Sequence, residues 1–384
     1  MKRSLWLGAL LVLSVSGCDW MKSGSTKDVA PPTELVEFAP TVGVSQVWSR
    51  KLGSGVGKAG LKLRAAYDDG RIFASDSSGA VFAFDAASGA QAWRIELDEP
   101  VSSSPGAGEG LVVVGGINGA VVALDAGSGA QRWTAEASSE VLAPPAVGGG
   151  VVVVRAIDGR IFGFDAADGT RRWVFDRGVP LLSLRGNGPP LIADGVVFAG
   201  YDNGKIVALT LSDGVLRWEQ TLAQSEGRTE LERMVDIDGE LATNGSELFA
   251  ASYRGQVGAL AADSGRALWS RDISSFVGVA VAGDQLLVVD DLGAVQALDV
   301  RSGAAFWKQE GLLRRWPGTP VAVGDYVVVG DFEGFLHWLS LDDGSFVARQ
   351  RHGKDGIRAA PLAIGDIVYT TSADGGLAAW RVGG

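Results

Sequence analysis

The sequence predicts an all-β fold, an eight-bladed β-propeller of four-stranded antiparallel blades closed by an N-terminal strand. Two observations predict it. A glycine followed five residues later by a large apolar residue recurs about every 40 residues, which is the period of a propeller. In six repeats, a second glycine precedes a tryptophan by four residues. The glycines of the first pattern are Gly79, Gly119, Gly159, Gly204, Gly255, Gly293, Gly334 and Gly375.

Residues 101–136 illustrate how one repeat forms a blade. The Asn118-Gly119 pair is typical of a two-residue hairpin, because both turn positions need positive φ. The β-branched run just before it indicates a buried strand. Small residues at the start of the repeat suit the crowded propeller axis. The four strands are expected at residues 101–107, at 111–114, at 121–124 and from 131 onward.

The recurrent tryptophans indicate a contact between adjacent blades. A large aromatic side chain at a fixed place after a turn is most simply explained by burial against the next repeat. The seventh repeat departs from the pattern, since Ala348 takes the place of the tryptophan. The six predicted docking residues are Trp93, Trp133, Trp173, Trp218, Trp269 and Trp307.

A strand from the N-terminus is predicted to close the ring, because the last repeat lacks its fourth strand. The eighth repeat ends at Trp380, which leaves no room for a fourth strand. Residues 44–52, which include Trp48, are expected to pair with residues 376–382. This pairing would close the ring and remove its open sheet edges.

The N-terminus reads as a targeting segment. Two basic residues precede an apolar run that is too short to span a bilayer, so residues 1–17 are predicted to be a signal peptide. The sequence Val15-Ser16-Gly17-Cys18 resembles the bacterial lipobox, and Cys18 is the only cysteine of the chain. Cys18 is therefore predicted to carry the lipid, residues 18–42 to form a flexible tether, and residues 43–384 to form the propeller.

Two insertions interrupt the repeat on one face. The interval from the docking tryptophan to the glycine just before the buried strand of the next repeat is 17 residues at Trp133–Gly150. It is 22 residues at Trp173–Gly195 and 27 at Trp218–Gly245. Both insertions join an outer strand to the next inner strand. Insertions in repeat proteins collect on the binding face. Apolar and charged residues there favour a protein-binding surface, and internal packing of these loops is the alternative. The candidate residues are Leu182, Leu184, Arg185, Asp236 and Asp238.

Composition argues against several other functions. The net charge is −11 and no basic run occurs, so nucleic acid is not an expected partner. The chain has two histidines and one cysteine, which makes a zinc site or a serine triad improbable. We therefore predict no catalytic residue, no metal and no cofactor.

The whole mature chain resembles the BamB family, lipoprotein subunits of the outer-membrane β-barrel assembly (BAM) complex. The passages that carry the likeness are residues 53–57, 182–186, 229–238 and 329–338. The resemblance implies a non-enzymatic scaffold whose two loops bind the periplasmic POTRA domains of BamA through the five residues named above. It also implies promotion of barrel insertion and a lipid-anchored location at the periplasmic face of the outer membrane.

Two alternatives stay open at this point. Quinoprotein dehydrogenases, which use pyrroloquinoline quinone and calcium, resemble the chain in their eight blades and docking tryptophans. They are usually longer, and many carry an adjacent cysteine pair that a single cysteine rules out here. The other alternative is a periplasmic propeller with a different protein partner. Asp19, which follows the lipidated cysteine, resembles a signal for retention in the inner membrane. The sequence does not decide whether nascent outer-membrane proteins also contact the ring.

Overall fold

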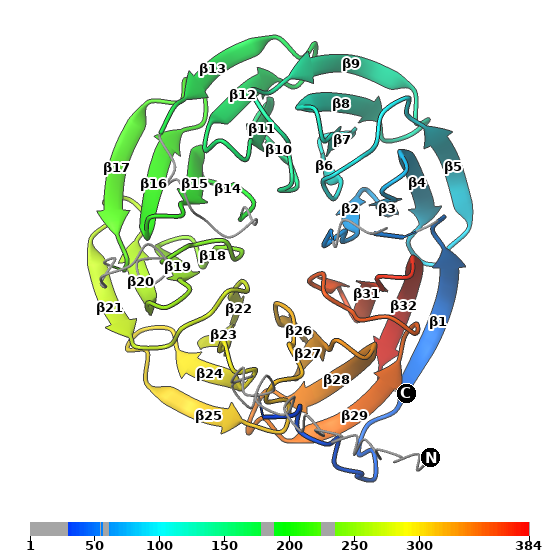
Figure 1. Ribbon diagram of the computed structural model, residues 1–384, viewed down its shortest axis with the longest axis vertical. Helices are drawn as coiled ribbons and strands as arrows, with labels where there is room; N and C mark the ends of the chain where they lie inside the picture. The colour runs from blue at the N-terminus through cyan, green and yellow to red at the C-terminus, as the bar shows by residue number, and fades with distance from the viewer. Residues whose placement is uncertain (1–29, 54, 57–60, 178–187, 224–234, 384) are drawn as a thin grey trace, which may run out of the picture.

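The computed structural model describes residues 30–53, 55–56, 61–177, 188–223 and 235–383. Eight four-stranded antiparallel sheets stand around a central axis, which confirms the predicted propeller (Figure 1). Blade 1 holds β2 to β5, each following blade holds the next four strands, and blade 8 combines β30 to β32 with β1. The described part of the chain contains no helix able to cross a bilayer.

The strands fall into four classes by their distance from the axis. The innermost are β2 (Ala66–Asp68), β6 (Gly106–Gly108), β10 (Ala146–Gly148), β14 (Leu191–Ala193), β18 (Ala242–Thr243), β22 (Ala280–Ala282), β26 (Val321–Val323) and β30 (Leu362–Ile364). The second strands are β3 (Arg71–Ser75), β7 (Leu111–Gly115), β11 (Val151–Arg155), β15 (Val196–Gly200), β19 (Glu247–Ala251), β23 (Gln285–Val289), β27 (Tyr326–Gly330) and β31 (Ile367–Thr371). The third strands are β4 (Ala80–Asp85), β8 (Ala120–Asp125), β12 (Ile161–Asp165), β16 (Lys205–Thr210), β20 (Val257–Ala261), β24 (Val295–Asp299), β28 (Phe335–Ser340) and β32 (Gly376–Val382). The outer strands are β5 (Gln91–Glu96), β9 (Gln131–Glu136), β13 (Arg171–Phe175), β17 (Leu216–Thr221), β21 (Ala267–Arg271), β25 (Ala305–Gln309), β29 (Phe346–Arg351) and β1 (Val44–Lys51).

The N-terminal strand closes the ring as predicted. β1 runs antiparallel to β32, with Val44 opposite Val382 and Lys51 opposite Gly376. A bulge between Gln46 and Trp48 adjusts the register. The eighth blade thus takes its outer strand from the other end of the domain, and no blade is left incomplete.

The innermost strands are shorter than the sequence predicts. In blade 2 the strand was expected over residues 101–107, but β6 covers only Gly106–Gly108. Crowding near the axis is the physical reason. A Cβ on Gly106 would lie 1.9 Å from the Pro145 carbonyl oxygen of the next blade. The residues before β6 are buried without regular pairing, and Ser102 bonds across to the Val141 carbonyl at 2.8 Å.

The recurrent tryptophans lie between adjacent blades. Trp133 belongs to blade 2, and its indole N–H donates to the Ala166 carbonyl of blade 3 at 2.9 Å. Its ring covers Gly169, where an added Cβ would lie 2.6 Å from the ring. Trp48 of the closing strand repeats this contact with Ala86 and Gly89 in blade 1. The same donation from indole to the next blade occurs at Trp93, Trp173, Trp218, Trp269 and Trp307.

Replacement of Trp133 by phenylalanine tests the indole hydrogen bond separately from packing. Trp133→Phe keeps an aromatic ring but leaves the Ala166 carbonyl without its donor, so the free energy of unfolding is expected to fall by about 1–2 kcal/mol. Thermal melting monitored by circular dichroism gives the measurement. Trp316→Phe, at a side chain that is 62% exposed, is the control and should leave the melting temperature unchanged. Equal melting of parent and Trp133→Phe would contradict the assignment.

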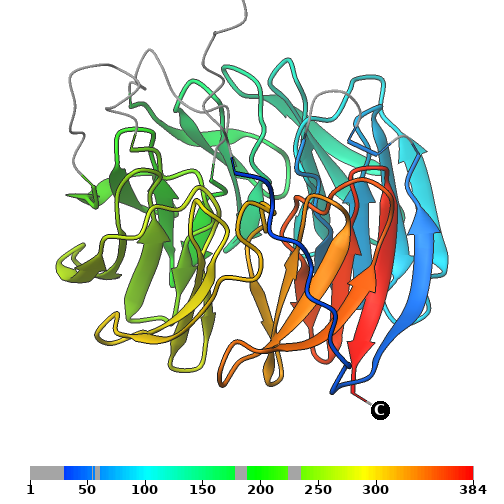
Figure 2. The same ribbon diagram turned by 60° about the horizontal axis from the view of Figure 1, so that its bottom comes forward.

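Residues 31–42 form a strap along the outside of blades 6 and 7, and Figure 2 shows this dark blue segment running from one rim to the other. Thr33 N–H donates to the Leu313 carbonyl at 3.0 Å, and Thr41 N–H donates to the Val347 carbonyl at 2.9 Å. Phe38 stacks on Phe346 with ring centroids 5.8 Å apart. The sequence predicted a tether over residues 18–42. The strap part of it contacts the ring, so the tether proposal is restricted to residues 18–30.

Candidate partner-binding surface

The two insertions lie on the same rim of the ring. Within an antiparallel blade, successive connections alternate between the two rims. The links from each outer strand to the next blade's first strand therefore share a rim with the turns between second and third strands, and we name it the upper rim (Figure 2). One insertion joins β13 to β14 and the other joins β17 to β18. Leu182, Leu184 and Arg185 lie outside the described residues, whereas Asp236 and Asp238 are described.

A fixed backbone carries the two aspartates. Ile237 N–H donates to the Tyr201 carbonyl at 3.2 Å, and Tyr253 N–H donates to the Asp236 carbonyl at 2.9 Å. The Ile237 side chain is fully buried in the core between blades 4 and 5. These contacts anchor the segment at the β15–β16 and β19–β20 turns, so the position of Asp238 does not depend on loop flexibility.

Asp238 has the electrostatics of a carboxylate that lacks a cation. Among the described residues, no group donates a hydrogen bond to either of its carboxylate oxygens. Burial raises the pKa of Asp238 to about 8, and the nearby carboxylates of Asp202 and Asp236 add to this effect. Arg155 and Lys62 act in the opposite direction without reversing it. A cationic side chain from a partner would restore the ionised form.

Asp236 differs from Asp238 in its burial. Its side chain lies almost wholly inside the protein, with 1% exposed, whereas Asp238 is half-buried. Asp238 is thus the more exposed residue of the two, although both of its carboxylate oxygens are buried. Asp236 contributes to the same negative potential from below the surface.

A buried arginine beneath this segment was not predicted from the sequence. Arg155, at the end of β11, is fully buried and lies 3.4 Å from an Asp202 carboxylate oxygen. Its guanidinium donates to the Gly188 carbonyl at 3.3 Å and lies over the Tyr201 ring at 5.0 Å. The sequence did contain a signal, because the equivalent strand ends are small in neighbouring blades, as at Gly115 and Gly200. Arg155 joins the link that bears the first insertion to the blade that bears the second.

An ion pair crosses the axis beside Asp238. Arg64, which precedes β2 in blade 1, pairs with Glu240, which precedes β18 in blade 5. These blades are opposite each other in the ring (Figure 1). Lys62 lies nearby, where burial lowers its pKa and the carboxylates of Asp238 and Glu240 oppose that shift. The upper rim thus has a centre of alternating charges, in which the buried carboxylate oxygens of Asp238 lack a described hydrogen-bonding partner.

Comparisons with known proteins identify the family and the fold. The family described as outer membrane protein assembly factor BamB matches residues 36–115 and 81–309. The Pseudomonas aeruginosa protein of that name is 44% identical over 372 residues, covering 97% of both chains. The Escherichia coli protein of that name is 32% identical and covers 98% of both chains. The crystal structure of BamB from Moraxella catarrhalis superposes with a TM-score of 0.81 at 29% identity, covering 88% of this chain and 99% of that one.

A second class of solved structure shares the fold alone. A quinohemoprotein alcohol dehydrogenase from Pseudomonas putida superposes with a TM-score of 0.71 at 15% identity, over 89% of this chain and 76% of that chain. Similarity at that level indicates the propeller and nothing about catalysis. Near full-length identity above 30% to several assembly factors is a different kind of evidence. The chain therefore belongs to the BamB family of outer membrane protein assembly factors.

Proposed function

We propose that the protein is a non-enzymatic, lipid-anchored scaffold subunit of the BAM complex that binds the POTRA domains of BamA through its upper rim. The observation that carries this proposal is Asp238, a partly exposed residue on a rigid backbone whose two buried carboxylate oxygens have no described hydrogen-bond donor. Such a group has an unfavourable free energy that a partner's arginine or lysine would relieve. Leu182, Leu184 and Arg185 belong to the neighbouring insertion and would supply apolar anchors and a second charge.

The scaffold would act by favouring particular arrangements of its partner. A binding protein shifts a conformational equilibrium only through different affinities for the two states. We infer that the rigid upper rim binds best to those POTRA arrangements that are productive for barrel insertion. The ring itself would not need to change shape, because the Asp238 segment is fixed by backbone hydrogen bonds to neighbouring blades.

The axis favours a scaffold over a quinoprotein enzyme. The Arg64–Glu240 ion pair joins opposite blades across the axis, and Lys62 is enclosed beside it. Arg64 and Glu240 neutralise each other, and Lys62 interacts with the carboxylates of Asp238 and Glu240. Incubation with pyrroloquinoline quinone and calcium, followed by dye reduction, tests the enzyme directly, and turnover would refute the scaffold.

The proposed anchor is an acylated Cys18 at the periplasmic face of the outer membrane. Family membership supports the outer membrane, whereas Asp19 is the residue that would favour retention in the inner membrane. Membrane fractionation of the full chain and of Asp19→Ser separates these two locations. A shift of the protein from inner to outer membrane in the variant would identify Asp19 as a retention signal.

Arg185→Ala tests the proposed interface. If the guanidinium is desolvated against BamA, its loss is expected to weaken association by about 2–4 kcal/mol. Titration calorimetry with purified POTRA domains gives the affinity, and a photocrosslinker at position 185 identifies the contact in cells. Arg177→Ala is the matched control, because Arg177 pairs with Glu219 within the same chain. Unchanged affinity of Arg185→Ala, or equal weakening by both variants, would contradict the site.

A further inference from the structure

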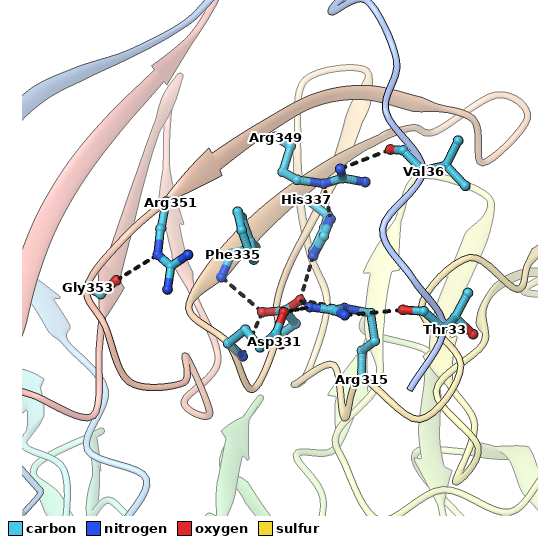
Figure 3. A network of polar contacts seen from close by, with 10 residues as sticks. Thr33, Val36, Arg315, Asp331, Phe335, His337, Arg349, Arg351 and Gly353 are labelled. Atoms are coloured by element: carbon cyan, nitrogen blue, oxygen red, sulfur yellow. Dashed lines mark hydrogen bonds and ion pairs between the residues drawn. The ribbon is translucent and has the colours of Figure 1, made fainter. Parts of the chain in front are cut away.

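Two arginines hold the strap against blade 7 (Figure 3). Arg315 Nη1 donates to the Thr33 carbonyl at 3.2 Å, and Arg349 Nη1 donates to the Val36 carbonyl at 3.0 Å. Arg349 also lies over the Phe38 ring, 5.0 Å from its centroid. The strap is therefore fixed by polar and aromatic contacts at Thr33, Val36 and Phe38.

A buried chain of hydrogen bonds connects the two arginines. Arg315 Nε donates to Asp331 at 2.8 Å, and His337 Nε2 lies 3.1 Å from the same carboxylate. On the other side of the imidazole, Arg349 Nε donates to His337 Nδ1 at 3.2 Å. A neutral His337 with its proton on Nε2 satisfies both contacts, and burial lowers its pKa in agreement with that form. Both clamping arginines are thus held in place by the core of blade 7.

The clamp determines where the N-terminal segment leaves the ring. Arg314 Nε donates to the Pro31 carbonyl at 2.7 Å, and Thr33 bonds to Leu313. Both partners belong to the link between β25 and β26, so the exit is on the upper rim at blades 6 and 7 (Figure 2). Cys18 precedes Pro31 by 13 residues, a separation that cannot exceed about 45 Å.

Exposed apolar side chains surround this exit. Trp316 is 62% exposed and Leu292, in the turn between β23 and β24, is 59% exposed. The Arg314 N–H donates to the Leu292 carbonyl at 2.6 Å, which joins the two turns. Trp316 has φ of +50° and Arg314 has φ of +61°, conformations that are unfavourable for residues other than glycine. Retained strain of this kind is often found at functional sites. The Trp316 indole rests against Phe332, with ring centroids 6.2 Å apart, and leaves most of its surface exposed.

We propose that this part of the upper rim contacts the phospholipid headgroup region of the membrane that holds the lipid anchor, with Trp316 and Leu292 as the inserted side chains. The proposal rests on the anchor at Cys18 described under the proposed function. Tryptophan is enriched at membrane–water interfaces, where its ring is partly buried in lipid and its N–H stays hydrated. The clamped exit brings this rim, rather than another, to the membrane.

The size of the patch favours a bilayer over a second protein. A stable protein interface buries about 800 Å² on each partner and involves about 20–30 residues a side. Among the described residues, the two turns at the exit expose two large apolar side chains, Trp316 and Leu292, and the strap adds Val36. A short tether gives the rim an effective concentration in the millimolar range at the surface to which the chain is attached, which is the membrane. A contact that is too weak to bind a free partner is therefore sufficient for binding to the membrane.

The charges around the patch restrict the kind of lipid surface. Glu310 and Glu333 have side chains that are 61% and 45% exposed near the strap exit, and Glu333 is paired with Arg315. Arg314 is directed to the Pro31 carbonyl. The rim therefore lacks the basic excess that attracts anionic lipids. We expect the same contact with zwitterionic vesicles and with vesicles that contain phosphatidylglycerol.

Lipid quenching of a fluorescent probe tests the contact in the full, lipidated chain. A nitrobenzoxadiazole label is attached at Leu292→Cys, and the control label is attached at Ile117→Cys. Ile117 is 49% exposed in the equivalent turn of blade 2, on the opposite side of the same rim. In phosphatidylcholine vesicles with doxyl-labelled lipid, we expect quenching at position 292 at least three times that at 117. Trp316→Ser should reduce the quenching at 292 at least twofold, whereas Phe306→Ser, an exposed aromatic on β25, should not.

Arginine variants test the role of the strap. Arg349→Ala, which frees the strap at Val36, should also lower quenching at position 292. Arg351→Ala on the same strand should not, because Arg351 bonds to Gly353 instead. Equal quenching at positions 292 and 117 would overturn the membrane contact while leaving the anchor intact. Failure of the chain to float with vesicles would refute both the anchor and the contact, and POTRA affinity measured in solution would show whether the partner site survives. Protection of position 292 by purified BamA without lipid quenching would overturn the proposal in favour of a protein interface.

Discussion

Deletion of residues 41–52 is expected to abolish cooperative folding of the ring. The deletion removes β1, which pairs with β32 over its full length from Val44 to Lys51. It also removes Trp48, whose indole packs on Gly89 and donates to the Ala86 carbonyl of blade 1. Blades 1 and 8 would then lose their mutual contact, and β32 would expose an unpaired edge. The Arg64–Glu240 ion pair across the axis does not replace this contact, because it joins blade 1 to blade 5 and leaves the edge of blade 8 unpaired.

The measurement is thermal unfolding followed by circular dichroism and calorimetry. The parent should show one sharp transition, and the deletion should show none, or aggregate through its open edge. Deletion of residues 31–40 is the control, because it removes most of the strap and leaves β1 in place. That shorter deletion should retain one transition at a lower temperature. A 41–52 deletion that melts like the parent would disprove closure by β1.

The ring could be predicted because its pattern is periodic and local. Asn118-Gly119 specifies a tight turn wherever it occurs, and Gly119 has φ of +86° in the structure. The closing strand could be predicted as well, since a repeat that ends at Trp380 is short of one strand and residues 44–52 match it. The length of the strands near the axis could not be predicted from the sequence. It depends on how closely neighbouring blades approach each other, as at Gly106 and Pro145.

The candidate site was located by insertion length, but its chemistry depends on the tertiary structure. Counting residues placed Asp236 and Asp238 in an insertion without showing that Asp236 is a buried residue and Asp238 a partly exposed one. Arg155 and Lys62 are distant in sequence from Asp238, and only the folded ring brings their charges near its carboxylate. The strap was missed for a related reason. A segment rich in polar residues and proline resembles a linker unless its partners, such as Arg315 and Arg349, are known.

Charge reversal at Asp238 is expected to weaken association with BamA POTRA domains by about 3–5 kcal/mol. An ammonium at this position would face the partner's cation and would stand near Arg155 and Lys62, so attraction is replaced by like-charge repulsion. Asp238→Lys is measured by titration calorimetry at pH 8. Asp366→Lys is the control, because Asp366 is an exposed aspartate on the opposite rim that pairs with Arg381. Equal losses in the two variants would indicate a general effect of net charge and would contradict the site.

Asp238→Asn distinguishes binding from stability through its pH dependence. In the free protein the pKa of Asp238 is about 8, and a partner cation would lower it, so binding releases a proton. Affinity of the parent for the POTRA domains should therefore rise by up to tenfold per pH unit toward pH 8 and level off above it. Asp238→Asn should bind weakly, with an affinity that does not depend on pH.

The free energy of unfolding changes with pH in the opposite direction to the affinity. Because the folded pKa lies above the unfolded value, the contribution of Asp238 to stability is fully present below about pH 4 and is lost as the pH rises to 8. At pH 8 the free energy of unfolding of Asp238→Asn should consequently be about 1–2 kcal/mol higher than that of the parent, since the substitution removes an unsatisfied charge. A variant that is less stable than the parent, or an affinity that does not change with pH, would show that Asp238 serves the fold instead of the partner.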